Sequence, residues 1–158
     1  FGYHGKYQNA ITDFLHWGGI FLPLRYCLFF LLRIFPIPPF YRGIYRLFGV
    51  KIGKDVFFGP DVVIDHSYPQ LIEIGDKCII GWGARILTHE GYIKHFRVGR
   101  VKIGNNVIIG AFSTIRCGVG IGNNTIIAMG ALVDKDVPPN RLVAGIPAHE
   151  IKKLKKLF

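Results

Sequence analysis

The sequence of 158 residues has few cysteines, and none of them belongs to a motif. Cys27, Cys78 and Cys117 are odd in number, widely spaced and without a C-x-x-C pair, so neither a zinc knuckle nor a disulfide framework is predicted. Reduced thiols of this kind favour a cytoplasmic protein. The sequence also lacks a G-K-[S/T] phosphate loop, a helix-turn-helix pattern and an aromatic RNA-binding sheet, so nucleic acid is not an expected partner.

Long uninterrupted apolar runs and an evident secretory signal are absent as well. The segment 14–45 is very apolar, but Arg25 and Arg33 interrupt it, and no run reaches the ~20 residues of a membrane-spanning helix. We expect one or two short helices within residues 1–49. These helices are expected to pack on the body of the protein or on another subunit. Alternatively, residues 14–48 contact the inner surface of a membrane, with their arginines at the headgroups.

Acidic residues are scarce, since 10 Asp and Glu stand against 20 Lys and Arg and give a net charge of +10. A basic balance is typical of proteins that bind phosphates, nucleic acid or anionic membranes, although surface solvation accounts for it equally well. Half of the residues are hydrophobic and 19% are charged, which excludes a disordered chain. The length fits one domain with a sizeable core.

What the sequence does contain is a six-residue repeat that begins at Ile52. An aliphatic or aromatic residue recurs at every sixth position and is usually followed by glycine or another small residue. This period fits neither an amphipathic helix nor a hairpin sheet, and it indicates a short strand followed by a sharp corner. The recurring residues form the inward series Ile52, Phe58, Ile64, Ile74, Ile80, Ile86, Ile103, Ile109, Ile115, Ile121, Ile127 and Val133.

Three such units make one triangular coil, so residues 50–138 predict about four stacked coils of a parallel β-helix that buries a column of aliphatic side chains. Insertions near residues 65–73 and 90–100 interrupt the period. Loops inserted into a solenoid bulge outward and often form its binding face. Residues 139–158 are expected to form a C-terminal extension and a helix.

The stretches IEIGDKCIIGWGARILTHE and VDKDVPPNRLVAGIPA make residues 50–153 resemble the hexapeptide-repeat acyltransferases, such as galactoside, maltose, serine and xenobiotic acetyltransferases. The resemblance implies a left-handed β-helix and a homotrimer with each active site between neighbouring subunits. It also implies acetyl-CoA as co-substrate, no metal, and transfer of an acyl group to the hydroxyl or amine of a small acceptor, such as a sugar or a saccharide precursor.

Acyl transfer needs a base that takes a proton from the attacking hydroxyl or amine. Histidine suits this role at neutral pH because its ordinary pKa is ~6.5. His89 ends the stretch ILTHE directly before the second insertion, where the family places its catalytic histidine, so it is the expected general base. His95, inside the insertion, is the second candidate, and an ordinary surface-loop histidine is the alternative.

The resemblance implies further site residues. Side chains of the two insertions are expected to contact the acceptor, and an ordinary polar loop is the alternative: Asp65, His66, Glu90 and His95. Residues of the later coils and of the C-terminal extension are expected to line the acyl-CoA groove and to meet its phosphates: Ala111, Met129, Asp134, Lys135, His149 and Lys152.

Two other functions share the predicted fold. A zinc enzyme similar to the γ-type carbonic anhydrases would use His66, His89 and His95 as ligands, although their spacing differs from that family's. A non-catalytic β-helix scaffold would need neither a histidine beside a long insertion nor a groove of small residues.

Overall fold

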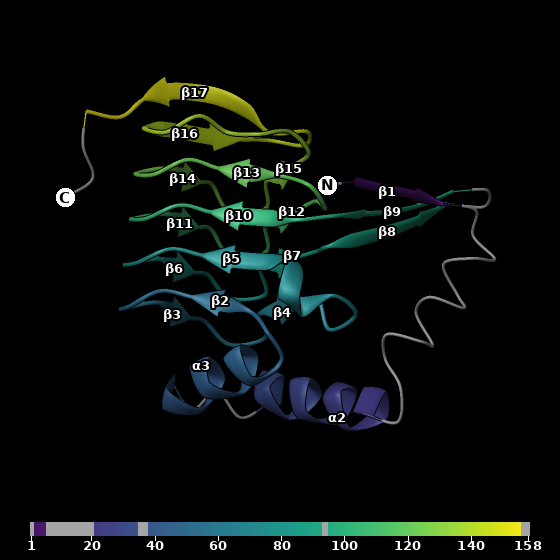
Figure 1. The fold of residues 1–158 in the computed structure, drawn as a ribbon. Helices are drawn as coiled ribbons and strands as arrows, with labels where there is room; N and C mark the ends of the chain where they lie inside the picture. Colours follow the sequence, from purple (N-terminus) through teal and green to yellow (C-terminus); the bar gives the residue numbers. More distant parts are fainter. Residues whose placement is uncertain (1, 6–20, 35–37, 93–94, 156–158) are drawn as a thin grey trace.

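The structure, a computed structural model, describes residues 2–5, 21–34, 38–92 and 95–155. They form a parallel β-helix with two helices lying across one end (Figure 1). The chain enters the β-helix at that end, and its last two strands cover the other end.

Each of four coils contributes one short strand to each of three faces, and the strands of a face pair in parallel. This arrangement confirms the predicted repeat. All members of the inward series are buried. The strands stay in register from coil to coil, as Ile64 with Ile86 and Ile115 with Val133 illustrate. The first face consists of β2 (Lys51–Ile52), β5 (Ile72–Ile74), β10 (Val101–Ile103) and β13 (Gly120–Ile121). The second consists of β3 (Phe57–Phe58), β6 (Ile79–Ile80), β11 (Ile108–Ile109), β14 (Ile126–Ile127) and β16 (Arg141–Ala144), and the third of β4 (Val63–Ile64), β7 (Arg85–Ile86), β12 (Thr114–Ile115) and β15 (Leu132–Val133).

A ladder of side-chain oxygens holds the corner between the first and second faces. Asp76, Asn105 and Asn123 each accept a hydrogen bond from a backbone N–H of the preceding coil, over 2.7 to 2.8 Å. The coils approach so closely here that a Cβ on Gly104 would lie 2.4 Å from the side-chain oxygen of Asn123. At this corner the glycine that follows the aliphatic residue is therefore required by the stacking itself.

Helices α2 (Phe21–Ile34) and α3 (Pro38–Leu47), here called the helical cap, confirm the predicted N-terminal helices. Phe29, Tyr41 and Tyr45 are buried on the inner side of the cap, and the Tyr45 ring lies 5.6 Å from that of Phe58 in the first coil. This side of the cap closes the apolar column, as the packing alternative predicts. No described helix combines the length and the apolar content that a membrane span needs.

Both insertions leave the β-helix at the corner between the third and first faces. The first contains a 3-10 turn, η1 (Pro69–Leu71). The second is an antiparallel hairpin of β8 (His89–Tyr92) and β9 (His95–Gly99), and β1 (Gly2–Gly5) pairs with the outer edge of β9. The hairpin projects sideways from the stacked coils (Figure 1).

The prediction of a C-terminal helix is wrong for the described residues. β17 (His149–Lys153) is a strand that pairs antiparallel with β16. β16 ends the second face and would otherwise expose an edge of unpaired backbone N–H and C=O groups. Pairing with this edge outweighs the modest helix propensity of the lysine-rich segment. Residues 156–158 lie outside the description.

Candidate active site

His89 and Asp65 form a hydrogen-bonded pair at the base of the hairpin. His89 Nδ1 lies 2.6 Å from Asp65 Oδ2. Because Ile64 is in register with Ile86, the residues that follow β4 and β7 leave the β-helix at the same corner in adjacent coils. The two predicted insertions therefore start side by side: Asp65 lies in the first, and His89 directly precedes the second.

Asp65 is almost completely buried, with 2% of its surface exposed. Its carboxylate accepts backbone hydrogen bonds from Ser67 at 2.9 Å and from Thr88 at 2.8 Å. Burial alone would raise the pKa of Asp65, but the hydrogen bond and charge of His89, with the backbone N–H groups of Thr88 and Ser67, lower it to about 2. An ionised carboxylate here makes Nδ1 of His89 the protonated nitrogen and leaves Nε2 to accept a proton.

Two aromatic rings fix the plane of the His89 ring. Phe96 of β9 lies over it with ring centroids 5.5 Å apart and planes 29° apart, and Tyr68 of the first insertion meets it edge-on at 5.9 Å. The His89 side chain is 31% exposed, so it remains open to solvent despite these contacts. The arrangement holds an imidazole in one orientation with access to a second reactant, which is what a general base requires.

Glu90 makes an ion pair and is not turned toward open space. Both of its carboxylate oxygens accept a hydrogen bond from Arg116 at 2.8 Å, and Arg97 approaches one of them at 3.4 Å. The Cys117 thiol lies 3.2 Å from the same carboxylate. Burial, together with the hydrogen bond and negative charge of Glu90, raises the pKa of Cys117 to about 12. Glu90 therefore anchors β8 to the third coil.

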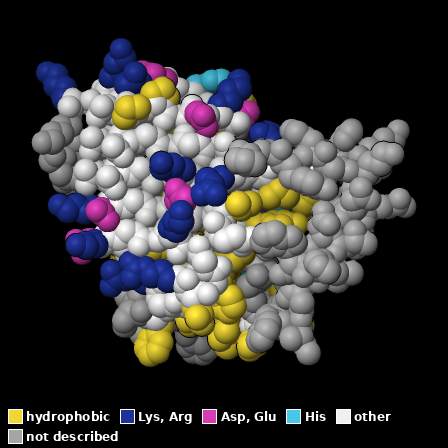
Figure 2. All heavy atoms as spheres, in the orientation of Figure 1, with side chains coloured by type: hydrophobic (Ala, Val, Ile, Leu, Met, Phe, Trp, Pro, Cys, Tyr) yellow, Lys and Arg dark blue, Asp and Glu magenta, His cyan; other side chains and the backbone are white. Residues whose placement is uncertain are grey.

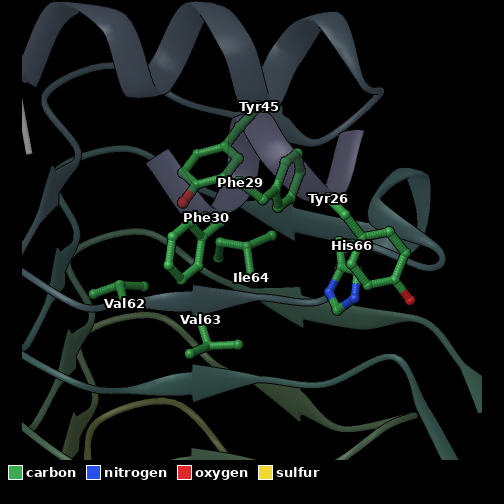
Figure 3. A pocket seen from close by; sticks show the side chains of 8 residues that line it. All are labelled: Tyr26, Phe29, Phe30, Tyr45, Val62, Val63, Ile64 and His66. Carbon is green, nitrogen blue, oxygen red and sulfur yellow. The ribbon is translucent and has the colours of Figure 1, made fainter. Parts of the chain in front are cut away.

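His66 follows Asp65 in sequence but turns toward the helical cap. Its ring centroid lies 3.9 Å from that of Tyr26 on α2 (Figure 3). Between α2 and the first coil lies a mostly apolar pocket of about 160 Å³. Its lining residues are Tyr26, Phe29, Phe30, Tyr45, Val62, Val63, Ile64 and His66.

His95 is the first residue of β9, and its side chain lies outside the description. In the hairpin, His95 pairs with Tyr92, whereas His89 pairs with Val98. The two histidines are thus three residue pairs apart along the hairpin, which corresponds to roughly 10 Å of strand. The competing candidate for the base lies at the far end of the hairpin.

The residues expected to bind acyl-CoA lie elsewhere on the β-helix. Ala111 and Met129 occupy successive coils at the corner between the second and third faces, joined by a hydrogen bond from the Gly130 N–H to the Ala111 carbonyl. Exposed apolar side chains cluster at this corner: Trp82, Phe112 and Met129. Asp134 and Lys135 follow β15, and His149 and Lys152 lie exposed on β17. Within one chain Ala111 and Met129 lie at a different corner from His89, whereas Asp134 and Lys135 follow β15 at the same corner, in the fourth coil.

Sequence reasoning missed Tyr68, Phe96 and Arg116. The hydrophobic pattern carries no signal for the first two, because they lie in insertions outside the repeat. In the part of the chain that the structure describes, no three His, Cys, Asp or Glu side chains are grouped to hold a metal ion. His66 faces Tyr26, whereas the ring of His89 is bonded to Asp65. These two histidines are therefore not arranged as the zinc ligands of the carbonic anhydrase alternative.

Comparison with known proteins places the repeat in context. The family described as "Bacterial transferase hexapeptide (six repeats)" matches residues 100–135, and "Hexapeptide repeat of succinyl-transferase" matches residues 49–87. Protein CapG of Staphylococcus aureus is 40% identical over 118 residues, which cover 69% of each chain. YvoF of Bacillus subtilis is 42% identical over 109 residues, 68% of this chain and 63% of YvoF. The galactoside O-acetyltransferase of Escherichia coli is 32% identical over 113 residues, 66% of this chain and 54% of that enzyme. The chain thus spans between about half and two thirds of these relatives.

Solved structures agree with the fold. A hexapeptide-repeat acetyltransferase of Vibrio cholerae, complexed with acetyl-CoA, is 28% identical with a TM-score of 0.62 over 68% of this chain and 62% of its own. A galactoside acetyltransferase in complex with coenzyme A has a TM-score of 0.61 at 24% identity, over 87% of this chain and 84% of its own, which is a likeness of fold alone. The predicted left-handed β-helix is thereby confirmed. With these sequence relatives and this fold, the chain belongs to the hexapeptide-repeat acyltransferase family.

Proposed function

We propose that this chain transfers an acyl group, most simply acetyl, from coenzyme A to the hydroxyl or amine of a small acceptor, with His89 as the general base. The observation that carries the proposal is the Asp65–His89 pair, in which a buried carboxylate holds Nδ1 of a solvent-accessible histidine at 2.6 Å. The acetyl-CoA and CoA complexes of related structures support the choice of donor.

The reaction follows from this geometry. The acceptor O–H or N–H donates a hydrogen bond to His89 Nε2, which takes the proton as the acceptor attacks the thioester carbonyl. A new C–O or C–N bond forms, the C–S bond breaks, and the departing CoA sulfur receives the proton from Nε2. Asp65 stabilises the imidazolium that exists between these two proton transfers.

The position of the acyl-CoA residues supports assembly as a homotrimer. Ala111 and Met129 lie at a different corner of the β-helix from His89. A chain that places this corner against the hairpin corner of a neighbour completes the site and covers exposed Trp82, Phe112 and Met129. We propose that acyl-CoA lies in the groove between two such chains, with its phosphates near Lys135, His149 and Lys152.

We further propose that the acceptor is a sugar or saccharide precursor. The galactoside specificity in the name of the Escherichia coli relative supports this class. Phe96 beside His89 offers a partly exposed aromatic face on which the C–H face of a sugar ring can pack. Asp65 and Glu90 are engaged within the protein, so we assign them to positioning His89 and the hairpin, while His66 remains a proposed acceptor contact.

The test compares His89→Ala with His149→Ala in the release of CoA thiol from acetyl-CoA, with a panel of saccharide acceptors. Loss of the base should lower kcat by about 10²- to 10⁴-fold with acetyl-CoA binding retained. His149→Ala keeps the base and should act mainly on the KM for acetyl-CoA. Equal turnover by His89→Ala and the wild type would contradict the mechanism, and about one zinc ion per purified chain would favour the carbonic anhydrase alternative.

A further inference from the structure

The helical cap is apolar on its outer side as well as on its inner side. Four large apolar side chains of the cap that do not line the pocket are between 44% and 77% exposed: Leu24 and Leu31 of α2, and Phe40 and Leu47 of α3. Figure 2 shows hydrophobic side chains gathered at this lower end of the molecule, with Lys and Arg beside them. A surface helix normally presents a polar face to water, so this face requires an apolar partner.

The charge of the same segment indicates what that partner is. No acidic residue occurs between Asp13 and Asp55, whereas six basic residues do: Arg25, Arg33, Arg42, Arg46, Lys51 and Lys54. Two of them are bonded within the protein, Arg46 to the Ile52 and Gly53 carbonyls and Lys51 to Glu73. Two copies meeting through their caps would bring two such basic segments together, and their repulsion opposes a symmetric dimer. An anionic surface with an apolar interior complements both the charge and the side chains.

The dimensions favour contact with a surface. α2 has 14 residues, which at 1.5 Å per residue gives about 21 Å, less than the ~30 Å of a bilayer core. We propose that the outer face of the helical cap docks on an anionic phospholipid membrane, with its exposed apolar side chains at the acyl boundary and the positive charge of residues 14–54 attracted to the phosphates. The proposal does not rest on the acyl-transfer activity, and neither of the following tests measures that activity.

The first test uses the unaltered chain. Cys27 is exposed on α2, whereas Cys78 and Cys117 are buried, so an environment-sensitive thiol dye labels the cap selectively. Vesicles of phosphatidylcholine with about one third phosphatidylglycerol should shift the emission to shorter wavelength and carry the protein on flotation. Pure phosphatidylcholine should do neither. Raising the salt from about 0.1 M to about 1 M, which shortens the Debye length from about 10 Å to about 3 Å, should weaken binding. An unchanged emission with anionic vesicles would overturn the proposal.

The second test uses matched variants at opposite ends of the molecule. Leu24→Glu and Leu31→Glu should each weaken partition into anionic vesicles about tenfold, since each places a charge where the bound protein has an apolar contact with the membrane. Ile151→Glu changes a side chain that is 60% exposed on β17, and it should have no such effect. Lys54→Glu should likewise weaken binding at least about fivefold more than Lys155→Glu, although both lower the net charge equally.

Circular dichroism establishes that each variant is folded, and the Cys27 measurement stands if one is not. Equal losses for the cap variants and their distant controls would show that only net charge matters, and would overturn the proposal. So would an oligomer of the wild type that Leu31→Glu dissociates in the absence of lipid, because the face would then be covered by a second copy.

Discussion

Replacing Asp65 by asparagine keeps the size of the side chain and removes its charge. Four hydrogen bonds reach the carboxylate: the Ser67 N–H meets Oδ1, while the N–H groups of Thr88 and His89 and the His89 ring meet Oδ2. An asparagine amide has one acceptor oxygen. With that oxygen in the place of Oδ2, three of the four bonds persist, and the amide NH₂ opposes the N–H of Ser67.

The structure sets the magnitude. The pKa of Asp65 is lowered from its ordinary 3.8 to about 2, which corresponds to about 2.5 kcal/mol in favour of the charged carboxylate. His89 supplies part of this stabilisation, and the carboxylate in turn favours the imidazolium that forms when His89 takes the acceptor proton. Asp65→Asn should therefore lower kcat at least about tenfold, with a smaller change in the KM for acetyl-CoA. The unsatisfied Ser67 N–H should cost about 1–3 kcal/mol of stability.

The pH dependence of stability provides an independent readout. Because folding lowers the pKa of Asp65, the carboxylate stabilises the fold above its ordinary pKa of 3.8, and this stabilisation is lost as the pH falls from about 5 to about 2. The unfolding free energy of the wild type should fall over that interval by up to about 2.5 kcal/mol more than that of Asp65→Asn.

Urea unfolding at stepped pH and thiol release at neutral pH measure the two effects. The reasoning would be refuted by a folded Asp65→Asn variant whose kcat stays within about threefold of the wild type. It would also be refuted if the unfolding free energies of the wild type and of Asp65→Asn fell by equal amounts on acidification.

Two further changes test the surroundings of the site and the scaffold. Burial and the charge and hydrogen bond of Glu90 raise the pKa of Cys117 to about 12, and Glu90→Gln removes the charge. The pKa of Cys117 should therefore fall, and iodoacetamide should modify this thiol faster at alkaline pH. An unchanged rate would show that Glu90 does not influence the thiol. Gly104→Ala places a Cβ 2.4 Å from the Asn123 side-chain oxygen and should lower the free energy of unfolding by about 2–4 kcal/mol, measured by thermal unfolding. Gly43→Ala, in open space on α3, should raise it by about 0.5–1 kcal/mol. Similar effects of both variants would contradict the stacking argument.

The scaffold could be predicted because one physical constraint repeats along the chain. Each coil buries an aliphatic or aromatic residue from each face, so positions such as Ile109, Ile115 and Ile121 must be apolar at a spacing of six residues. The C-terminal strand could not be found in this way, because its pairing depends on the open edge of β16 and not on its own pattern.

The site was only partly predictable. His89 stands out because it ends a repeat unit before a long insertion. The register of Ile64 with Ile86 brings Asp65 into the same corner, but nothing in the sequence orients its side chain inward. The role of Glu90 depends on Arg116, which is 26 residues away and reaches it only because the hairpin folds against the third coil.

The most direct test of the central claim is a double-mutant cycle of His89→Ala and Asp65→Asn, measured as kcat/KM for acetyl-CoA with one active acceptor. If Asp65 acts through His89, the two residues behave as a unit, and the double variant should be no slower than His89→Ala alone. If Asp65→Asn instead lowers kcat/KM by the same factor in the absence of His89 as in its presence, the two act independently and the account of the site is wrong.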